Sequence, residues 1–308
     1  MKTHTIRRGF LFTLAARLLF AGCASRRSDE ERRGDAAEQT AGVPVETVRT
    51  DSFSMDFIRF GRGRKTLVIL PGLSVQSVMG SAEAVALAYE PFAEEYTVYL
   101  FDRRNELPET YTVRDMARDT AEAFRVLGLR DIYLFGASQG GMIAEIIASE
   151  HPELVCALAL GSSAVRVTPE GYRTIEKWIG LAKDGDAEGL YLAFGEAVYP
   201  GEVFEQYREI LIETAKSVTE EDLSRFVVLA EGVKDFDVTD ELEAIRCPVL
   251  ALESRDDRVL GPEAAEQYAE LAAGRPGFEL FVYEGYGHAA YDTAPDYKDR
   301  LARFFAGA

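Results

Sequence analysis

The sequence has few of the residues that hold metal ions. Its 308 residues include only three cysteines, Cys23, Cys156 and Cys247, and only three histidines, and it has no Cys-x-x-Cys pair. A zinc site needs four clustered ligands, or three and a water molecule. Residues 184–189 (DGDAEG) resemble the start of a calcium loop, but Gly195 stands where that loop needs a bidentate glutamate. We therefore expect no metal site.

Positive charge is also scarce. The chain has 34 Lys and Arg residues against 52 Asp and Glu residues, which gives a net charge of -18 at pH 7. Such a surface repels phosphate backbones and anionic lipid headgroups, so nucleic acid is not an expected partner. The hydrophobic content of 47% is enough for a substantial core and excludes a disordered chain.

The first 23 residues have the layout of an export signal. A basic start precedes an apolar stretch at residues 10–22, which is too short to span a membrane. The letters FAGC, which end at Cys23, resemble a bacterial lipobox, in which cleavage leaves a lipid-modified cysteine at the new N-terminus. Phe20 in place of the usual Leu, and Arg17 within the apolar stretch, depart from that pattern. The letters RRGFL also resemble part of a twin-arginine signal.

These features predict three segments. They are a signal at residues 1–23 with Cys23 as the lipid attachment, a charged flexible tether at residues 24–45, and a folded body at residues 46–308. The expected location is the bacterial cell envelope, with a lipid anchor in a membrane and the body facing outside the cytoplasm. Membrane contact is expected only through that anchor. The alternatives are export without a lipid, or an uncleaved extension on a cytoplasmic protein.

From Phe53 onward, short apolar runs alternate with helical patterns. The runs TLVILPG, YTVYLFD, DIYLFGA, VCALALG and PVLALES are typical of parallel strands buried on both faces, whereas FSMDFIRF alternates like an early antiparallel strand. This order predicts an α/β fold with a mostly parallel central sheet and helices on both faces. Between Gly161 and Arg246, four helical segments follow one another without a strand, which indicates a helical cap at about residues 162–246.

Ser138 lies in the stretch LFGASQGGMIAE, between a predicted strand and a predicted helix. A tight turn there forces the serine into strained backbone geometry, and only very small neighbours fit around it, as Gly136, Gly140 and Gly141 do. The hydroxyl then lies at the carboxyl edge of the sheet, beside a helix N-terminus that favours developing negative charge. Ser138 is therefore a candidate nucleophile.

A serine nucleophile needs a base. His4 lies in the signal, and His151 follows a helix that leads to the opposite edge of the sheet, where a structural role is expected. His288, in the loop YEGYGHAAYD after a late apolar run, can approach the carboxyl edge. An acid to orient the imidazole is offered by the loop RDDRVLGPE after PVLALES, which contains Asp256 and Asp257.

The stretches LPGLS, FDRRN, GASQGG, CPVLALESRDDRV and GYGH together resemble the α/β-hydrolase superfamily over about residues 46–308. The resemblance implies a cap inserted after the sixth strand, Ser138 as nucleophile, His288 as general base and acid, and Asp257 as its partner. Asp257 is favoured over Asp256 because Ser254 then takes the place of the family's small turn residue.

The resemblance also implies an oxyanion hole formed by the backbone N–H groups of Leu73 and Gln139. Pro71-Gly72 stands where most members have His-Gly, so the glycine that lets this loop turn is kept. The strands that begin at Cys156 and Cys247 are neighbours in the family's sheet. An exported protein could join these two cysteines, but we expect two free thiols, because pairs across adjacent parallel strands are strained.

These residues predict a serine hydrolase of the carboxylesterase type that acts on a small-molecule acyl substrate without a cofactor. Thioesters, lactones, activated C–C bonds and acyl transfer to another acceptor use the same triad and stay open as alternatives. The alternative from another class is a non-catalytic envelope lipoprotein that uses the fold as a binding module. The sequence does not indicate the oligomeric state.

Overall fold

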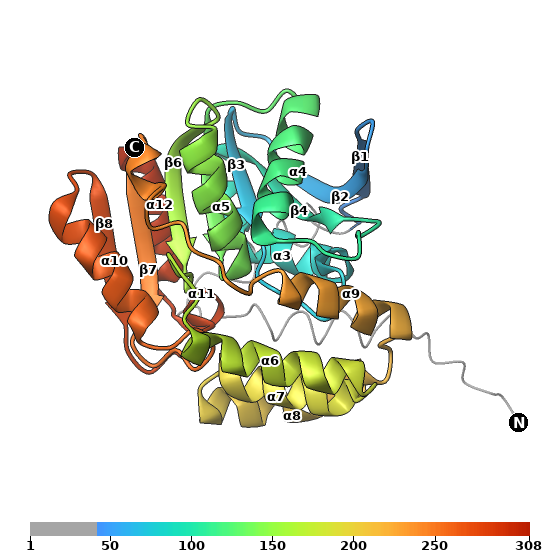
Figure 1. Cartoon of the computed structure of the whole chain (residues 1–308). Helices are drawn as coiled ribbons and strands as arrows, with labels where there is room; N and C mark the ends of the chain where they lie inside the picture. Colours follow the sequence, from blue (N-terminus) through green and yellow to red (C-terminus); the bar gives the residue numbers. More distant parts are fainter. Residues whose placement is uncertain (1–41) are drawn as a thin grey trace, which may run out of the picture.

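A single sheet of eight strands runs through the molecule, with the strand order β1-β2-β4-β3-β5-β6-β7-β8 (Figure 1). The computed structural model describes residues 42–308. β2 is antiparallel to both of its neighbours, and all other neighbouring pairs are parallel. The predicted α/β fold with a mostly parallel sheet is thus confirmed. The strands are β1 (Val45–Arg49), β2 (Ser54–Gly61), β3 (Lys65–Leu70), β4 (Tyr96–Arg104), β5 (Ile132–Ala137), β6 (Val155–Gly161), β7 (Val249–Ser254) and β8 (Phe278–Tyr283).

Helices cover both faces of the sheet (Figure 1). Helices α4 (Val113–Val126), α5 (Gln139–Glu150) and α10 (Glu263–Gly274) pack on one face. Helices α3 (Ala82–Ala88) and α12 (Tyr297–Gly307) pack on the other. Three short helices join them: η1 (Val78–Ser81), η2 (Glu90–Phe92) and α11 (Ala290–Thr293).

Strand β5 shows why its apolar run folds as a fully buried strand. Ile132 and Leu134 point into the core on the α5 side, and Phe135 and Ala137 point into the core on the α12 side. Each is less than 9% exposed. Because both faces are apolar, β5 is stable only at the centre of a sheet that is covered on both sides. This position places the residue after Ala137 at the middle of the carboxyl edge.

The cap follows the sixth strand, as predicted. Between β6 and β7 the chain forms α6 (Pro169–Lys183), α7 (Ala187–Val198), α8 (Gly201–Ala215), α9 (Glu220–Glu231) and the short η3 (Leu242–Ala244). Helices α6 to α9 lie across the carboxyl ends of the strands (Figure 1). The two ends of the insertion meet in a bridge between Arg166 and Asp237, so the cap leaves and rejoins the body at one place. Asp186 accepts a hydrogen bond from the amide of Gly189, and so caps α7.

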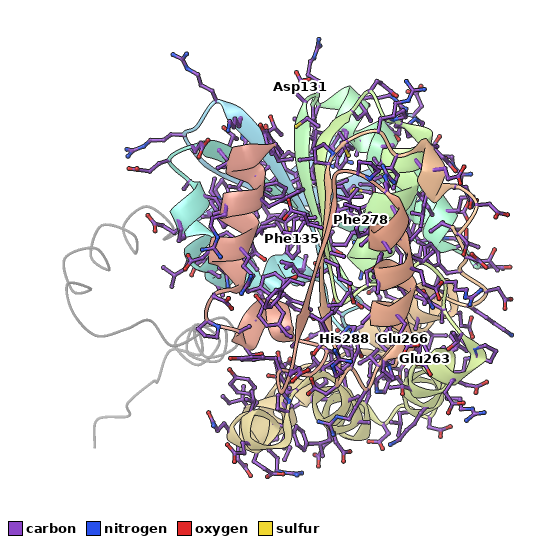
Figure 2. All side chains as sticks on the ribbon, turned by 90° about the vertical axis from the view of Figure 1, so that its left-hand side faces the viewer. Asp131, Phe135, Glu263, Glu266, Phe278 and His288 are labelled. Carbon is purple, nitrogen blue, oxygen red and sulfur yellow. The ribbon has the colours of Figure 1, made fainter. Side chains whose placement is uncertain are left out.

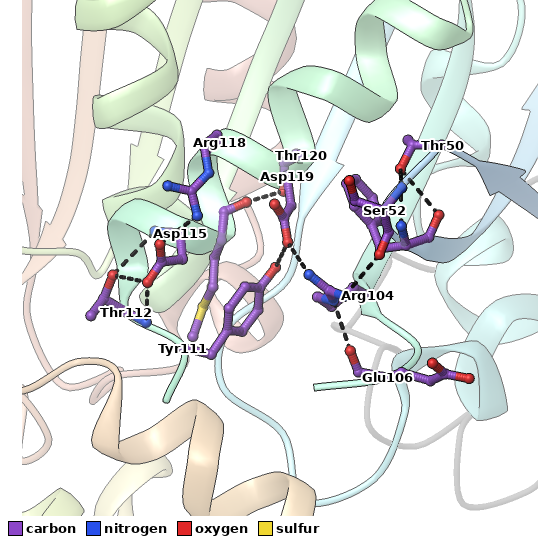
Figure 3. Close-up of polar contacts among 12 residues, drawn as sticks. Thr50, Ser52, Arg104, Glu106, Tyr111, Thr112, Asp115, Arg118, Asp119 and Thr120 are labelled. Carbon is purple, nitrogen blue, oxygen red and sulfur yellow. Dashed lines mark hydrogen bonds and ion pairs between the residues drawn. The ribbon is translucent and has the colours of Figure 1, made fainter. Parts of the chain in front are cut away.

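The loop after β4 is fixed to α4 by a polar cluster around the buried Asp119 (Figure 3). Arg104 donates to Asp119 at 3.2 Å and to the carbonyl of Ser52 at 3.2 Å, and the Tyr111 hydroxyl donates to the same Asp119 oxygen at 2.9 Å. Burial raises the pKa of the Tyr111 hydroxyl well above its ordinary value, so it stays a donor. The cluster holds the end of β4 in place, and this end carries residues that reach the candidate site.

Some of the predicted features lie outside residues 42–308, which the structure describes. The predicted signal, with Cys23, lies outside this range, as does the predicted tether up to residue 41.

Strand β1 is not among the strands that the sequence predicts. Cys156 and Cys247 are free thiols. No helix within residues 42–308 is long and apolar enough to cross a membrane.

Candidate active site

Ser138 occupies the turn between β5 and α5 with φ of 52° and ψ of -122°. This backbone conformation is unfavourable for a residue with a side chain, and it costs about 1–3 kcal/mol. The turn is possible because its neighbours are glycines. A Cβ on Gly136 would lie 2.3 Å from the carbonyl oxygen of Gly140, and a Cβ on Gly140 would lie 2.1 Å from that of Leu70. The strand, the helix and the neighbouring loop therefore approach one another more closely than any other residue would allow.

His288 and Asp257 complete one hydrogen-bonded chain with Ser138. The Ser138 Oγ lies 2.9 Å from His288 Nε2, and His288 Nδ1 lies 2.7 Å from Asp257 Oδ2. All three side chains are buried. Figure 2 shows His288 at the cap end of the sheet, whereas Asp131, which precedes β5, lies at the opposite end. The carboxylate fixes the ring so that Nε2 is free to accept the serine proton.

The two adjacent aspartates have different partners. The second oxygen of Asp257 accepts hydrogen bonds from the amides of Val259 at 2.7 Å and Leu260 at 3.0 Å. Asp256 points instead to the loop that carries the histidine, where it accepts from the amides of Gly285 at 3.0 Å and Gly287 at 3.1 Å. The structure thus places Asp257 against the imidazole, and Asp256 holds the loop that presents it.

His151 lies far from this chain of residues, at the carboxyl end of α5. Its Nδ1 lies 2.8 Å from the Arg125 guanidinium and 3.8 Å from Glu153. These contacts join α5 to α4 and to the loop before β6. Within residues 42–308 no three His, Cys, Asp or Glu side chains are arranged to hold a metal ion.

Leu73 and Gln139 both line the pocket in front of Ser138. Gly72 lies so close that a Cβ there would be 3.2 Å from the Ser138 Cβ. Among the described residues, no group accepts a hydrogen bond from the backbone amide of Leu73 or of Gln139. The two N–H groups are therefore not used by the fold. They are available to an oxygen atom bound beside Ser138.

Arg103 supports both of these residues. It lies within the stretch FDRRN, but no role could be assigned to it from the sequence. It is 3% exposed, and its guanidinium donates to the carbonyl of Pro71 at 2.7 Å and to the side-chain oxygen of Gln139 at 3.1 Å. Burial lowers its pKa to about 10, so it remains charged at neutral pH. One cation thus fixes the loop before Leu73 and the side chain of Gln139 together.

The cap is hydrogen-bonded to both sides of the site. The Gln139 side chain donates to the carbonyl of Leu229 at 2.7 Å, and Arg225 pairs with Asp102, next to Arg103, at 2.9 Å. On the histidine side, the amide of Ala289 donates to the carbonyl of Val198 at 3.0 Å. The position of the cap and the position of the site residues therefore depend on each other.

Two buried glutamates lie behind the turn. The Glu145 carboxyl accepts a hydrogen bond from Tyr268 at 2.8 Å, and Glu253 accepts from the amide of Ser163 at 3.3 Å. The Ser163 hydroxyl in turn donates to the carbonyl of Ser138 at 3.1 Å. Burial raises the pKa of both glutamates well above the ordinary value. With no cation among their partners, these acids are stable in the fold when they are protonated.

Comparison with known proteins agrees with this architecture. The model of the alpha/beta hydrolase family matches residues 67–302. The chain belongs to this family. RutD of Caulobacter sp. (strain K31), to which carbamate hydrolase activity is ascribed, is 24% identical over 255 residues, which cover 79% of this chain and 91% of RutD.

Many solved structures share the fold, and two crystal structures serve as examples. One is MGS-M2, an alpha/beta hydrolase enzyme from a Medee basin deep-sea metagenome library, with a TM-score of 0.75 and 19% identity over 85% of this chain and 97% of that one. The other is the enol-lactonase from Burkholderia xenovorans LB400, with a TM-score of 0.70 and 17% identity over 85% of this chain and 100% of that one. The sheet and helices that position the site at the carboxyl edge are therefore shared with these two proteins.

Replacement of each aspartate by asparagine should separate their roles. Asp257→Asn is expected to lower the kcat of hydrolysis by about 10⁴, because an asparagine cannot stabilise the protonated imidazole. Asp256→Asn is the matched control and should cost roughly tenfold or less, because it removes only loop contacts. Steady-state kinetics of both variants measure this. A larger loss in Asp256→Asn would contradict the assignment.

Protein stability should depend on pH through the buried glutamates. The pKa values of Glu145 and Glu253 are raised in the folded state. The stability that these two acids contribute is therefore fully present below the ordinary glutamate pKa of about 4.3, and it is lost as the pH rises toward their folded-state pKa. In that window each acid lowers the free energy of unfolding by roughly 1.4 kcal/mol per pH unit. The Tm of Glu253→Gln should therefore fall less than the Tm of the parent protein between pH 5 and pH 8. Equal losses in thermal unfolding curves would refute this expectation.

Proposed function

We propose that this chain is a serine hydrolase of the carboxylesterase type, which cleaves carboxylic esters through an acyl-enzyme on Ser138. One observation carries the proposal: Ser138, His288 and Asp257 form a single buried hydrogen-bonded chain, and the serine sits in a strained turn below an apolar pocket. Strain of this kind persists where the surrounding structure requires it, and such places are often functional sites.

In the proposed reaction, Ser138 Oγ forms a bond to the carbonyl carbon of the ester while its proton passes to His288 Nε2. The carbonyl oxygen becomes an oxyanion held by the amides of Leu73 and Gln139. The C–O bond then breaks, and His288 gives its proton to the departing alcohol. A water molecule repeats the sequence on the acyl-enzyme, releases the carboxylic acid and restores the serine. Asp257 stabilises the charged imidazole in both halves.

The reactions for which the similar proteins are named support acyl chemistry of this kind. A carbamate hydrolase and an enol-lactonase both act at a carbonyl carbon. The pocket supports an apolar ester as the substrate, because its wall consists mainly of Val, Leu, Ile, Phe and Met side chains. Thioesters, lactones and carbamates belong in the same substrate panel, since each offers the nucleophile a carbonyl carbon.

Ser138→Ala tests the proposal. The variant should fold normally and lose ester hydrolysis by roughly 10⁴–10⁶ in kcat, because the hydroxyl carries the chemistry. It should also lose labelling by a fluorophosphonate probe. Ser149→Ala, in the helix that follows Ser138, is the matched control and should keep both activity and labelling. Retention of more than a few percent of activity by a folded Ser138→Ala would exclude Ser138 as the nucleophile, and an unlabelled, inactive parent would favour a binding module.

We also propose that Cys23 carries a lipid that anchors the protein in the cell envelope. The support is the lipobox-like FAGC and the charged segment that follows it. Cys23→Ser should move the protein from the membrane fraction to the soluble fraction, because the lipid is the only anchor proposed. Metabolic labelling with an alkynyl fatty acid followed by fractionation measures this. Absence of label on the parent protein would end the lipoprotein proposal.

A further inference from the structure

Among the described residues that line the pocket beside Ser138, one has a fully buried polar side-chain atom without a hydrogen-bond partner, and the proposed reaction does not use it. Body and cap both contribute to the wall of the pocket, and the body supplies the reacting groups. The cap contributes apolar residues and one tryptophan: Ile175, Trp178, Phe194, Val198 and Val233. Trp178 is 2% exposed, and its ring lies 4.6 Å from that of Phe194, centroid to centroid.

The indole N–H of Trp178 makes no hydrogen bond with any described residue, and it is buried from solvent. Among residues 42–308, seven other buried side-chain N or O atoms also have no partner, but none belongs to a residue that lines this pocket. Buried donors are almost always paired, because an unpaired one loses its hydrogen bonds to water without replacement. The indole is a donor only, so what it needs is an acceptor.

We propose that Trp178 recognises the substrate by donating its indole N–H to a neutral oxygen in the apolar part of the ester. The acceptor is a carbonyl oxygen of a ketone or an amide, placed in the acyl chain or in the alcohol chain. A carboxylate does not fit, because no Lys or Arg lines the pocket and the chain is strongly acidic. The inference rests on the proposed ester hydrolysis and names its substrate class, an ester with a second, remote carbonyl.

A site built around a hydrogen-bond donor selects strongly against analogues that lack the acceptor. The preference should appear in pairs of esters of the same chain length. Methyl 5-oxohexanoate carries a ketone in the acyl chain, and methyl hexanoate does not. The ester 4-oxopentyl acetate carries it in the alcohol chain, and pentyl acetate does not. The ketone is remote from the reacting carbonyl in both cases, so intrinsic reactivity within a pair is nearly equal.

Trp178 is the only tryptophan of the chain, so ¹⁵N-labelled protein has one indole N–H signal in an NMR spectrum. Full-length Ser138→Ala protein is titrated with the four esters, which it binds without hydrolysis. One of the two keto esters should shift the indole proton downfield, and its alkyl counterpart should leave it almost unchanged. The keto ester that responds identifies the acyl or the alcohol chain. Equal shifts within both pairs, or no shift with any ester, would overturn the inference.

Turnover gives the second readout. In the parent protein, kcat/KM for the responding keto ester should exceed that of its alkyl counterpart by roughly tenfold or more. Trp178→Phe keeps an aromatic ring but removes the donor, and it should bring this ratio close to one. Phe194→Leu, on the same wall, is the control that reduces volume and keeps the donor, so the ratio should persist.

The two proposals fail in different ways. A parent that hydrolyses keto and alkyl esters equally well would overturn the role of Trp178 and leave ester hydrolysis in place. A parent that hydrolyses neither and is not labelled by a fluorophosphonate would end the proposed hydrolase function, whereas the indole shift would still report recognition of the remote carbonyl.

Discussion

The strained backbone of Ser138 is the constraint on which the rest of the site depends. Its cost of about 1–3 kcal/mol is offset by contacts that leave the turn no alternative. The amide of Ser138 donates to the carbonyl of Gly161 at 2.8 Å, and its own carbonyl accepts from the amide of Gly141 at 2.8 Å and from the hydroxyl of Ser163. These contacts come from β6, from the loop that follows it and from α5. With this geometry the hydroxyl faces His288, and the amide of Gln139, the first residue of α5, has no partner among the described residues.

The sequence was informative where function depends on local geometry. The glycines around Ser138 and the apolar runs of β3 to β7 are local signals, and His288 was found because few histidines compete with it. Strand β1 was missed because it is an edge strand in which only Val48 is buried. The contacts of Arg103 with Gln139, of Gln139 with Leu229 and of Tyr268 with Glu145 could not be predicted. Their partners are 36, 90 and 123 residues apart, and only the packed fold brings them together.

The cap is part of the site as well as its cover. One cap helix, α9, contacts the nucleophile side through Leu229 and Arg225, and the end of α7 contacts the histidine side through Val198. A substrate that enters between cap and body must leave these hydrogen bonds intact or replace them. Movement of α9 would displace Gln139, whose amide belongs to the candidate oxyanion hole. Substrate binding under the cap and alignment of the reacting groups are therefore coupled through a few hydrogen bonds.

The ionisable groups buried around Ser138 favour the negative charge that the proposed reaction develops in its transition state. Arg103 stays charged at neutral pH beside the loop that carries Leu73 and the start of α5 that carries Gln139. Glu145 and Glu253, on the other side of the turn, have raised pKa values that favour their neutral forms. An ionised carboxylate at either position would repel an oxyanion forming at Ser138, and this repulsion is strong where water is excluded. The burial that destabilises ionised Glu145 and Glu253 therefore also keeps negative charge away from the place where the proposed reaction develops it.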